Sequence, residues 1–158
     1  MRNPLERDRR YFRSMLKHLD HVTIAVSDIP AAIRFFSLLG FELDKDVMIS
    51  GLTMDRYMGI TNLEARHVTL FLKGAVPRLE VQLLHFNRPT VAAASDVTRL
   101  DRIGFNHICF AVDNIEEVIA NVTMAGVRLK NEMMAFHDRK LVFLEGPDGI
   151  TVELAEWI

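Results

Sequence analysis

Several features that would assign this chain to a particular class of protein are scarce or missing. The 158 residues contain one cysteine, Cys109, so no disulfide forms within the chain, which is typical of a reducing compartment. No apolar run approaches the roughly 18 residues that a membrane-spanning helix needs. The formal net charge is only −2, so no overall field favours nucleic acid or a membrane surface. Glycine-rich phosphate loops, CxxC pairs and GxSxG elbows are absent. We therefore expect a cytoplasmic protein with neither a nucleic-acid nor a membrane partner.

What the chain does have is a repeated segment. Residues 19–29, LDHVTIAVSDI, reappear 86 residues later as residues 105–115, FNHICFAVDNI. In each copy a histidine begins an alternating apolar run, which is typical of a strand, and a capping side chain then begins a helix. Gly40 and Gly126 stand at the same offset, where a helix is expected to end. The repeat predicts a duplicated structural unit.

This pattern predicts one α+β domain over residues 1–158, built from two β-α-β-β-β modules. The first module covers residues 18–86, a connector covers residues 87–104, and the second module covers residues 105–158. Residues 90–102 of the connector suit a helix. Residues 1–17 carry six basic side chains among apolar ones. We expect them to form a helical extension that packs on the domain or on a partner subunit, in preference to nucleic acid or a membrane.

Four of the predicted strands carry a polar side chain on the face opposite their apolar one. His21 and His107 occupy matching places on the first strand of each module, among small or polar neighbours. Gln82 and Glu153 occupy matching places on the last strands, each between two apolar residues that point the other way. Burying such a polar group without a partner costs roughly 1–3 kcal/mol, and a shared cation removes that cost. The repeat therefore predicts a metal site made of His21, Gln82, His107 and Glu153.

Two imidazoles, one amide oxygen and one carboxylate suit one divalent ion per site, namely Mn, Fe(II), Co, Ni or Zn, with positions left for water or substrate. Glu80 lies two residues from Gln82 on the same face, and it is an alternative first-module ligand, a catalytic base or a solvated rim residue. A lone histidine on a strand is more often a hydrogen-bonded structural residue, and the matched pair argues against that interpretation here. His67, His85 and His137 have no such match, so we do not expect them among the ligands.

Residues 18–157 resemble the vicinal oxygen chelate superfamily, which includes glyoxalase I, methylmalonyl-CoA epimerase, extradiol dioxygenases and bleomycin-resistance proteins. The resemblance is carried by LDHVTIAVSDIPAAIRFFSLLGFEL, GFNHICFAVDNIEEV and FLEGPDGITVELAEW. It implies an open cup formed by the two modules around a divalent metal, with the ligands carried over to His21, Gln82, His107 and Glu153. The segment VQLLHF supports Gln82 over Glu80. The resemblance also implies a homodimer, because small single-chain members usually dimerise.

The ligand set is similar to that of methylmalonyl-CoA epimerases and some glyoxalases. This implies an isomerase, epimerase or lyase that acts on a small carbonyl or thioester substrate. In such enzymes the metal chelates vicinal oxygens and stabilises an enediolate while a base moves a carbon-bound proton. Glu153 and Glu80 are the candidate catalytic residues.

Two other functions stay open. His21, His107 and Glu153 alone form a 2-His-1-carboxylate set, as in an Fe(II)-dependent extradiol dioxygenase. A metal-free protein that binds a small molecule or confers resistance is the other alternative. The methionine-rich segment 48–58 suits an adaptable hydrophobic wall beside a substrate, or a structural or dimer-contact loop.

Overall fold

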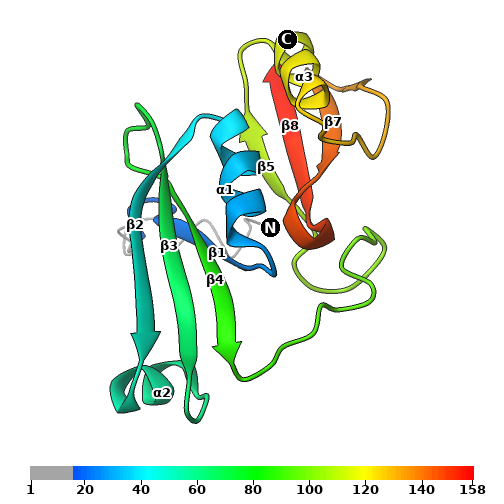
Figure 1. Ribbon diagram of the computed structural model, residues 1–158. Helices are drawn as coiled ribbons and strands as arrows, with labels where there is room; N and C mark the ends of the chain where they lie inside the picture. The colour runs from blue at the N-terminus through cyan, green and yellow to red at the C-terminus, as the bar shows by residue number, and fades with distance from the viewer. Residues whose placement is uncertain (1–15) are drawn as a thin grey trace, which may run out of the picture.

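The structure, a computed structural model, describes residues 16–158, so the helix expected over residues 1–17 lies almost entirely outside the described residues. These residues form two four-stranded mixed sheets and three α-helices, which confirms the predicted α+β class (Figure 1). The strand order is β1-β4-β3-β2 in the first sheet and β5-β8-β7-β6 in the second. The bounds are β1 (His21–Ala25), β2 (Phe41–Ser50), β3 (Glu64–Leu72), β4 (Glu80–Arg88), β5 (Ile108–Ala111), β6 (Met134–Phe136), β7 (Arg139–Glu145) and β8 (Thr151–Trp157).

Helices α1 (Ile29–Leu38) and α3 (Ile115–Met124) begin and end at equivalent places in the two modules. The carboxylate of Asp28 accepts a hydrogen bond from the backbone N–H of Ala31, and the side chain of Asn114 accepts one from the N–H of Glu117. These bonds satisfy N–H groups that have no partner inside the helix. Gly40 and Gly126 follow the two helices with φ of +89° and +92°, a conformation that favours glycine. Both predicted helix starts and stops are confirmed.

The two modules pair their strands in the same way. The first strand of each module runs parallel to the last, β1 beside β4 and β5 beside β8. In the first sheet Thr23 is the register partner of Gln82, and in the second Cys109 is the register partner of Glu153. Because Cys109 is the repeat equivalent of Thr23, Gln82 and Glu153 are structurally equivalent positions. The correspondence inferred from the sequence is therefore present in the sheets.

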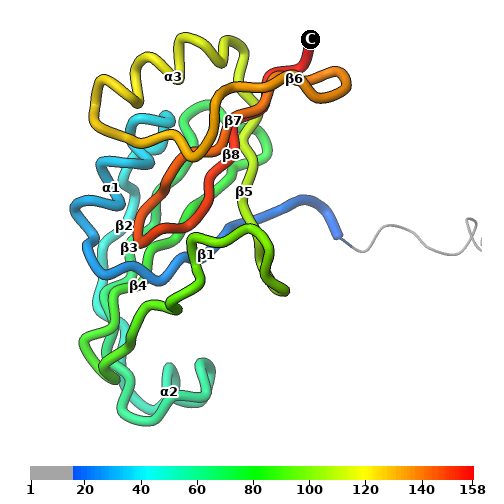
Figure 2. The backbone as a smooth tube through the Cα atoms, turned by 90° about the vertical axis from the view of Figure 1, so that its right-hand side faces the viewer, coloured from blue at the N-terminus to red at the C-terminus, as the bar shows by residue number. Residues whose placement is uncertain are grey.

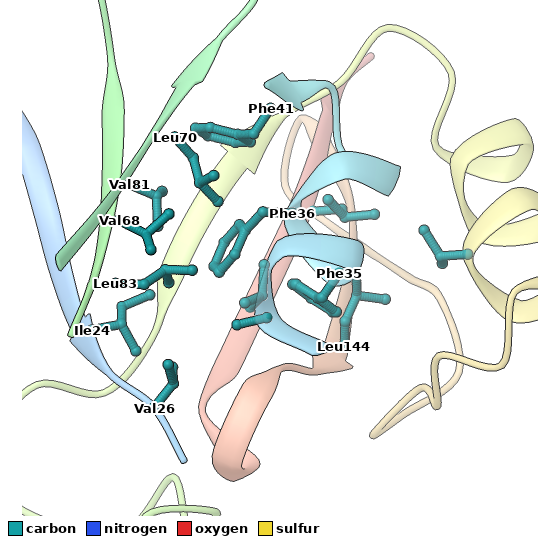
Figure 3. Packing of buried hydrophobic residues seen from close by; sticks show 14 of the residues in the cluster. Ile24, Val26, Phe35, Phe36, Phe41, Val68, Leu70, Val81, Leu83 and Leu144 are labelled. Atoms are coloured by element: carbon teal, nitrogen blue, oxygen red, sulfur yellow. The ribbon is translucent and has the colours of Figure 1, made fainter. Parts of the chain in front are cut away.

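One hydrophobic core joins the two modules. Figure 3 shows Phe35 and Phe36 of α1 between apolar side chains of the first sheet and Leu144 of the second. The rings of Phe41 and Phe110, one from each module, meet with centroids 5.5 Å apart. Since Val81, Leu83, Val152 and Leu154 of β4 and β8 belong to this core, the alternate residues of these strands lie on the faces turned away from it.

The structure differs from the prediction in the connector, where residues 90–102 contain turns and no helix. A short helix, α2 (Leu52–Met58), follows β2, and Figure 2 shows it at the end of the molecule opposite α3. In the second module Leu129 forms only an isolated bridge to Leu144, and the second strand of this module lies further on, at β6.

Candidate metal centre

His107, which immediately precedes β5, meets Glu153 of β8 at the second sheet. The imidazole Nε2 of His107 lies 3.1 Å from a carboxylate oxygen of Glu153, and the two side chains are 33% and 12% exposed. The ring of Phe143, the register partner of Glu153 on β7, packs edge-on against the imidazole with centroids 5.3 Å apart. An imidazole nitrogen and a carboxylate oxygen at this spacing, partly open to solvent, suit the ligation of a divalent metal.

His21 and Gln82 lie on the first sheet, on the face turned away from the core. The amide oxygen of Gln82 accepts a hydrogen bond from the Nε2–H of His67 at 3.1 Å and a longer one from the Thr23 hydroxyl at 3.5 Å. The amide nitrogen of Gln82 donates to Glu80 at 3.1 Å. These contacts hold the amide oxygen between His67 of β3 and Thr23 of β1, and His21 stands two residues before Thr23.

Glu80 is the register partner of His21 and therefore shares its face of the sheet. Burial alone raises the pKa of the Glu80 carboxyl, but hydrogen bonds from Arg78 and Gln82 and the charge of Arg78 outweigh it, so that the pKa lies below its usual value. The Nε–H of Arg78 donates to Glu80 at 2.7 Å, and a terminal nitrogen of the same guanidinium donates to Asp44 at 2.6 Å. A carboxylate held ionised by an arginine is a weak proton acceptor.

Cys109 lies on β5 beside Glu153. Burial, the hydrogen bond to Glu153 and the charge of that carboxylate raise the pKa of the Cys109 thiol to about 12. Since the thiolate is the reactive form of cysteine, this environment disfavours Cys109 as a nucleophile near neutral pH. The position agrees with its repeat equivalent Thr23, which is also a small side chain beside the candidate ligand of the last strand.

The four predicted ligands form two pairs on different sheets. His107 and Glu153 make one half-site, and His21 and Gln82, with Glu80 beside them, make the other. Within the described part of the chain no group of three or more His, Cys, Asp or Glu side chains is placed to hold one metal ion. Both half-sites are on faces that point away from the core that the two sheets share.

The other histidines are placed differently from one another. His67 belongs to the first half-site through its bond to Gln82, and the repeat gave no sign of this because its second-module counterpart is not a histidine. Its alternation with Thr69 on β3 is the signal that places it on the same face. His85 donates from Nδ1 to the carbonyl of Val26, on the opposite face from Gln82, as expected. His137 is exposed in a turn with φ of +53°.

An apolar cluster continues the first half-site toward α2. Leu84 and Phe86 follow Gln82 on the same face of β4, and they pack with Met54 and Met58 of α2. The carboxylate of Asp55 holds the loop after α2 by accepting hydrogen bonds from two backbone N–H groups at 2.8 and 2.9 Å. Met54 and Met58 of the methionine-rich segment therefore form part of an apolar wall at one end of the polar face, whereas Met48, Leu52 and Tyr57 are exposed.

Comparison with known proteins agrees with this architecture. A family model described as the Glyoxalase/Bleomycin resistance protein/Dioxygenase superfamily matches residues 18–154. Along most of its length the chain is 24% identical to the uncharacterized protein YaeR of Escherichia coli, over 143 residues that cover 89% of this chain and 97% of that protein. A shorter stretch of 51 residues, 32% of this chain and 16% of the other, is 35% identical to glyoxalase I of Saccharomyces cerevisiae.

A solved glyoxalase family protein from Bacillus cereus has the same fold, with a TM-score of 0.82 and 23% identity over 92% of this chain and 97% of that one. In the described residues, no helix has the length and apolar character needed to cross a membrane. The family model spans nearly the whole of both modules, and the expectation drawn from the repeated segments is confirmed. The chain belongs to the Glyoxalase/Bleomycin resistance protein/Dioxygenase superfamily.

Proposed function

We propose that this protein is a divalent-metal-dependent enzyme of the glyoxalase or epimerase type, acting on a small carbonyl or thioester substrate. The observation that carries the proposal is the equivalence of the two half-sites. In each, a histidine at the start of a module's first strand or just before it stands two residues ahead of Thr23 or Cys109, the register partner of the oxygen donor on the last strand. Together His21, Gln82, His107 and Glu153 supply two nitrogen and two oxygen donors, a set suited to Mn, Co, Ni, Zn or Fe(II).

We further propose that a homodimer completes the site, with the first half-site of one chain facing the second half-site of its partner. The two half-sites adjoin β1 and β5, which are edge strands of their sheets and have one side unpaired among residues 16–158. Exposed apolar side chains flank these strands, Leu19 before β1 and Ile103 and Phe105 before β5. Exposed apolar side chains beside unpaired edge strands favour an interface with a second chain.

Each part of the site has a separate role in this proposal. A metal held by His21, Gln82, His107 and Glu153 would supply Lewis-acid chemistry, polarising the substrate's oxygens and stabilising negative charge. Glu153 is the better candidate for the base that moves a carbon-bound proton, because its carboxylate lies beside the imidazole of His107 and, among the described residues, accepts no arginine hydrogen bond like the one that Glu80 accepts from Arg78. The apolar wall of α2, Met54 and Met58 with Phe86, gives the substrate's non-reacting part a dry, adaptable surface.

Metal content is the direct test. Protein purified without chelators is expected to hold about one divalent ion per chain by inductively coupled plasma mass spectrometry, and His107→Ala is expected to lose it. His137→Asn is the matched control, since it removes a histidine outside the site and asparagine tolerates the positive φ there.

The identity of the ion then selects the assay. Mn, Co, Ni or Zn directs the search to isomerase, epimerase and lyase substrates, whereas iron with substrate-dependent oxygen uptake would make the protein a dioxygenase. Protein that binds no metal even after reconstitution would overturn the proposal in favour of a metal-free binding protein.

A further inference from the structure

Both candidate histidine ligands are held by the residue that precedes them. The Nδ1 of His21 lies 2.7 Å from a carboxylate oxygen of Asp20, and the Nδ1 of His107 lies 2.8 Å from the side-chain oxygen of Asn106. The two pairs are repeat equivalents, LDH in the first module and FNH in the second. The same contact therefore occurs twice, on two different sheets and with two different side chains.

The hydrogen bonds determine which ring nitrogen carries the proton. A carboxylate oxygen only accepts, so the Nδ1 of His21 must donate to Asp20. At the second site the amide of Asn106 is oriented by its nitrogen, which donates to the backbone carbonyl of Leu100 in the connector. Its oxygen therefore faces His107 and accepts from Nδ1–H.

A proton on Nδ1 leaves the lone pair of a neutral imidazole on Nε2. At His107 this nitrogen faces the carboxylate oxygen of Glu153 at 3.1 Å. Two lone pairs facing each other at this distance repel unless both atoms bind one cation, either a proton or a metal ion. The contacts of Asn106 and Glu153 with opposite sides of one ring thus present Nε2 as a metal ligand and leave Nδ1 occupied.

We propose that Asp20 and Asn106 are positioning residues that hold His21 and His107 in the Nδ1–H tautomer with Nε2 free for the metal. This inference rests on the proposed metal-dependent function. Asn106 is expected to hold its histidine more firmly than Asp20 does, because its amide nitrogen also bonds to Leu100 of the connector. The Asp20 side chain is 77% exposed, so its hydrogen bond to His21 competes with water.

The experiment uses four full-length variants, Asp20→Ala, Asp20→Asn, Asn106→Ala and Asn106→Asp. Long-range ¹H–¹⁵N NMR spectra of the metal-free proteins report the tautomer of each neutral histidine. The wild type is expected to show Nδ1–H at His21 and His107. In Asn106→Ala the proton of His107 is expected to move to Nε2, where Glu153 accepts it, and Asn106→Asp, which keeps an acceptor oxygen, is expected to restore Nδ1–H. Asp20→Ala and Asp20→Asn are expected to behave likewise at His21.

Two histidines serve as internal references in every spectrum. His85 donates from Nδ1 to the carbonyl of Val26, and His67 donates from Nε2 to the amide oxygen of Gln82. Neither contact involves Asp20 or Asn106, so both tautomers must be unchanged in all four variants. A change at His85 would mean that the alanine variant had altered the fold. The wild type would then be compared with the conservative variant at that position, Asp20→Asn or Asn106→Asp.

Calorimetric titration with Zn²⁺ is the second measurement. The loss of a group that orients a metal-bound histidine typically weakens metal binding by about 10- to 100-fold, and we expect Asn106→Ala to fall in this range and Asp20→Ala below it. Nε2–H tautomers in the wild type, or Zn²⁺ affinities equal to wild type in both alanine variants, would overturn the positioning role. Wild-type protein with Nδ1–H tautomers but no affinity for Zn²⁺ or the other divalent ions would support the positioning contacts and overturn the proposed function.

Discussion

At the scale of single residues, the candidate site contains donors whose properties depend on one or two neighbours. Glu80 and Glu153 occupy the same face of equivalent strands, yet Glu80 bonds to Arg78 and Glu153 approaches an imidazole. The sequence placed both carboxylates on the correct face through strand alternation. The sequence did not indicate that Arg78 bonds to Glu80, because Arg78 lies outside the strands and its side chain is oriented partly by Asp44 of β2.

Cys109 gives a prediction at this scale, since it is the only cysteine and its alkylation is therefore unambiguous. With a thiol pKa near 12 in the folded protein, iodoacetamide at about pH 8 is expected to modify native Cys109 at least about 100-fold more slowly than the urea-unfolded chain. Glu153→Gln removes the carboxylate and is expected to speed the native reaction. Mass spectrometry of timed samples measures both rates, and equal rates in folded and unfolded protein would show that folding does not raise the pKa of this thiol.

At the scale of elements, the two modules begin and end their helices with the same kinds of residue at equivalent positions. Each connects its first strand to its helix with a capping side chain and ends the helix before a glycine with positive φ. These are local interactions between residues three or four apart, so they could be predicted from the sequence. α2 was missed because it has only seven residues and no side-chain cap, and its order comes from packing against β3 and β4.

The two helix caps are expected to contribute equally. Asp28→Ala and Asn114→Ala should each lower the free energy of unfolding by about 1 kcal/mol, because each leaves one backbone N–H without its partner. Asp28→Asn and Asn114→Asp retain an acceptor oxygen and should lose much less. Urea unfolding followed by circular dichroism gives the four values, and alanine variants as stable as their conservative counterparts would contradict the role of the caps.

At the scale of the whole molecule, the first helix decides how the modules meet. Phe35 and Phe36 of α1 contribute to the core between the two sheets, and the carboxylate of Asp148 after β7 accepts hydrogen bonds from the backbone N–H and hydroxyl of Ser27 before α1. The half-sites consequently lie on faces turned away from this core. A second chain is what the proposed function requires to bring complementary halves together.

Mixing two inactive chains tests this directly. His21→Ala damages the first half-site and Glu153→Ala the second, so neither variant alone is expected to bind metal. In a mixed dimer one site carries both changes and the other carries neither. Random association makes about half of the dimers mixed, so co-refolded protein is expected to regain roughly a quarter of the wild-type metal content.

The control for this experiment is a mixture of His21→Ala with Gln82→Ala, which damages the same half-site twice. Every site in that mixture has a damaged first half, and no metal is expected to return. If the first mixture also regains no metal although both variants form dimers, each site is contained within one chain and the shared arrangement is wrong.

The sequence by itself determined the two modules, the helix boundaries and the four candidate ligands, because strand alternation, helix capping and an 86-residue repeat are all written in local spacing. Tertiary structure alone decided three other matters: that His67 bonds to Gln82, that Arg78 holds Glu80 ionised, and that the two half-sites lie on separate sheets. Each depends on contacts between strands brought together by a core whose packing geometry no local pattern specifies.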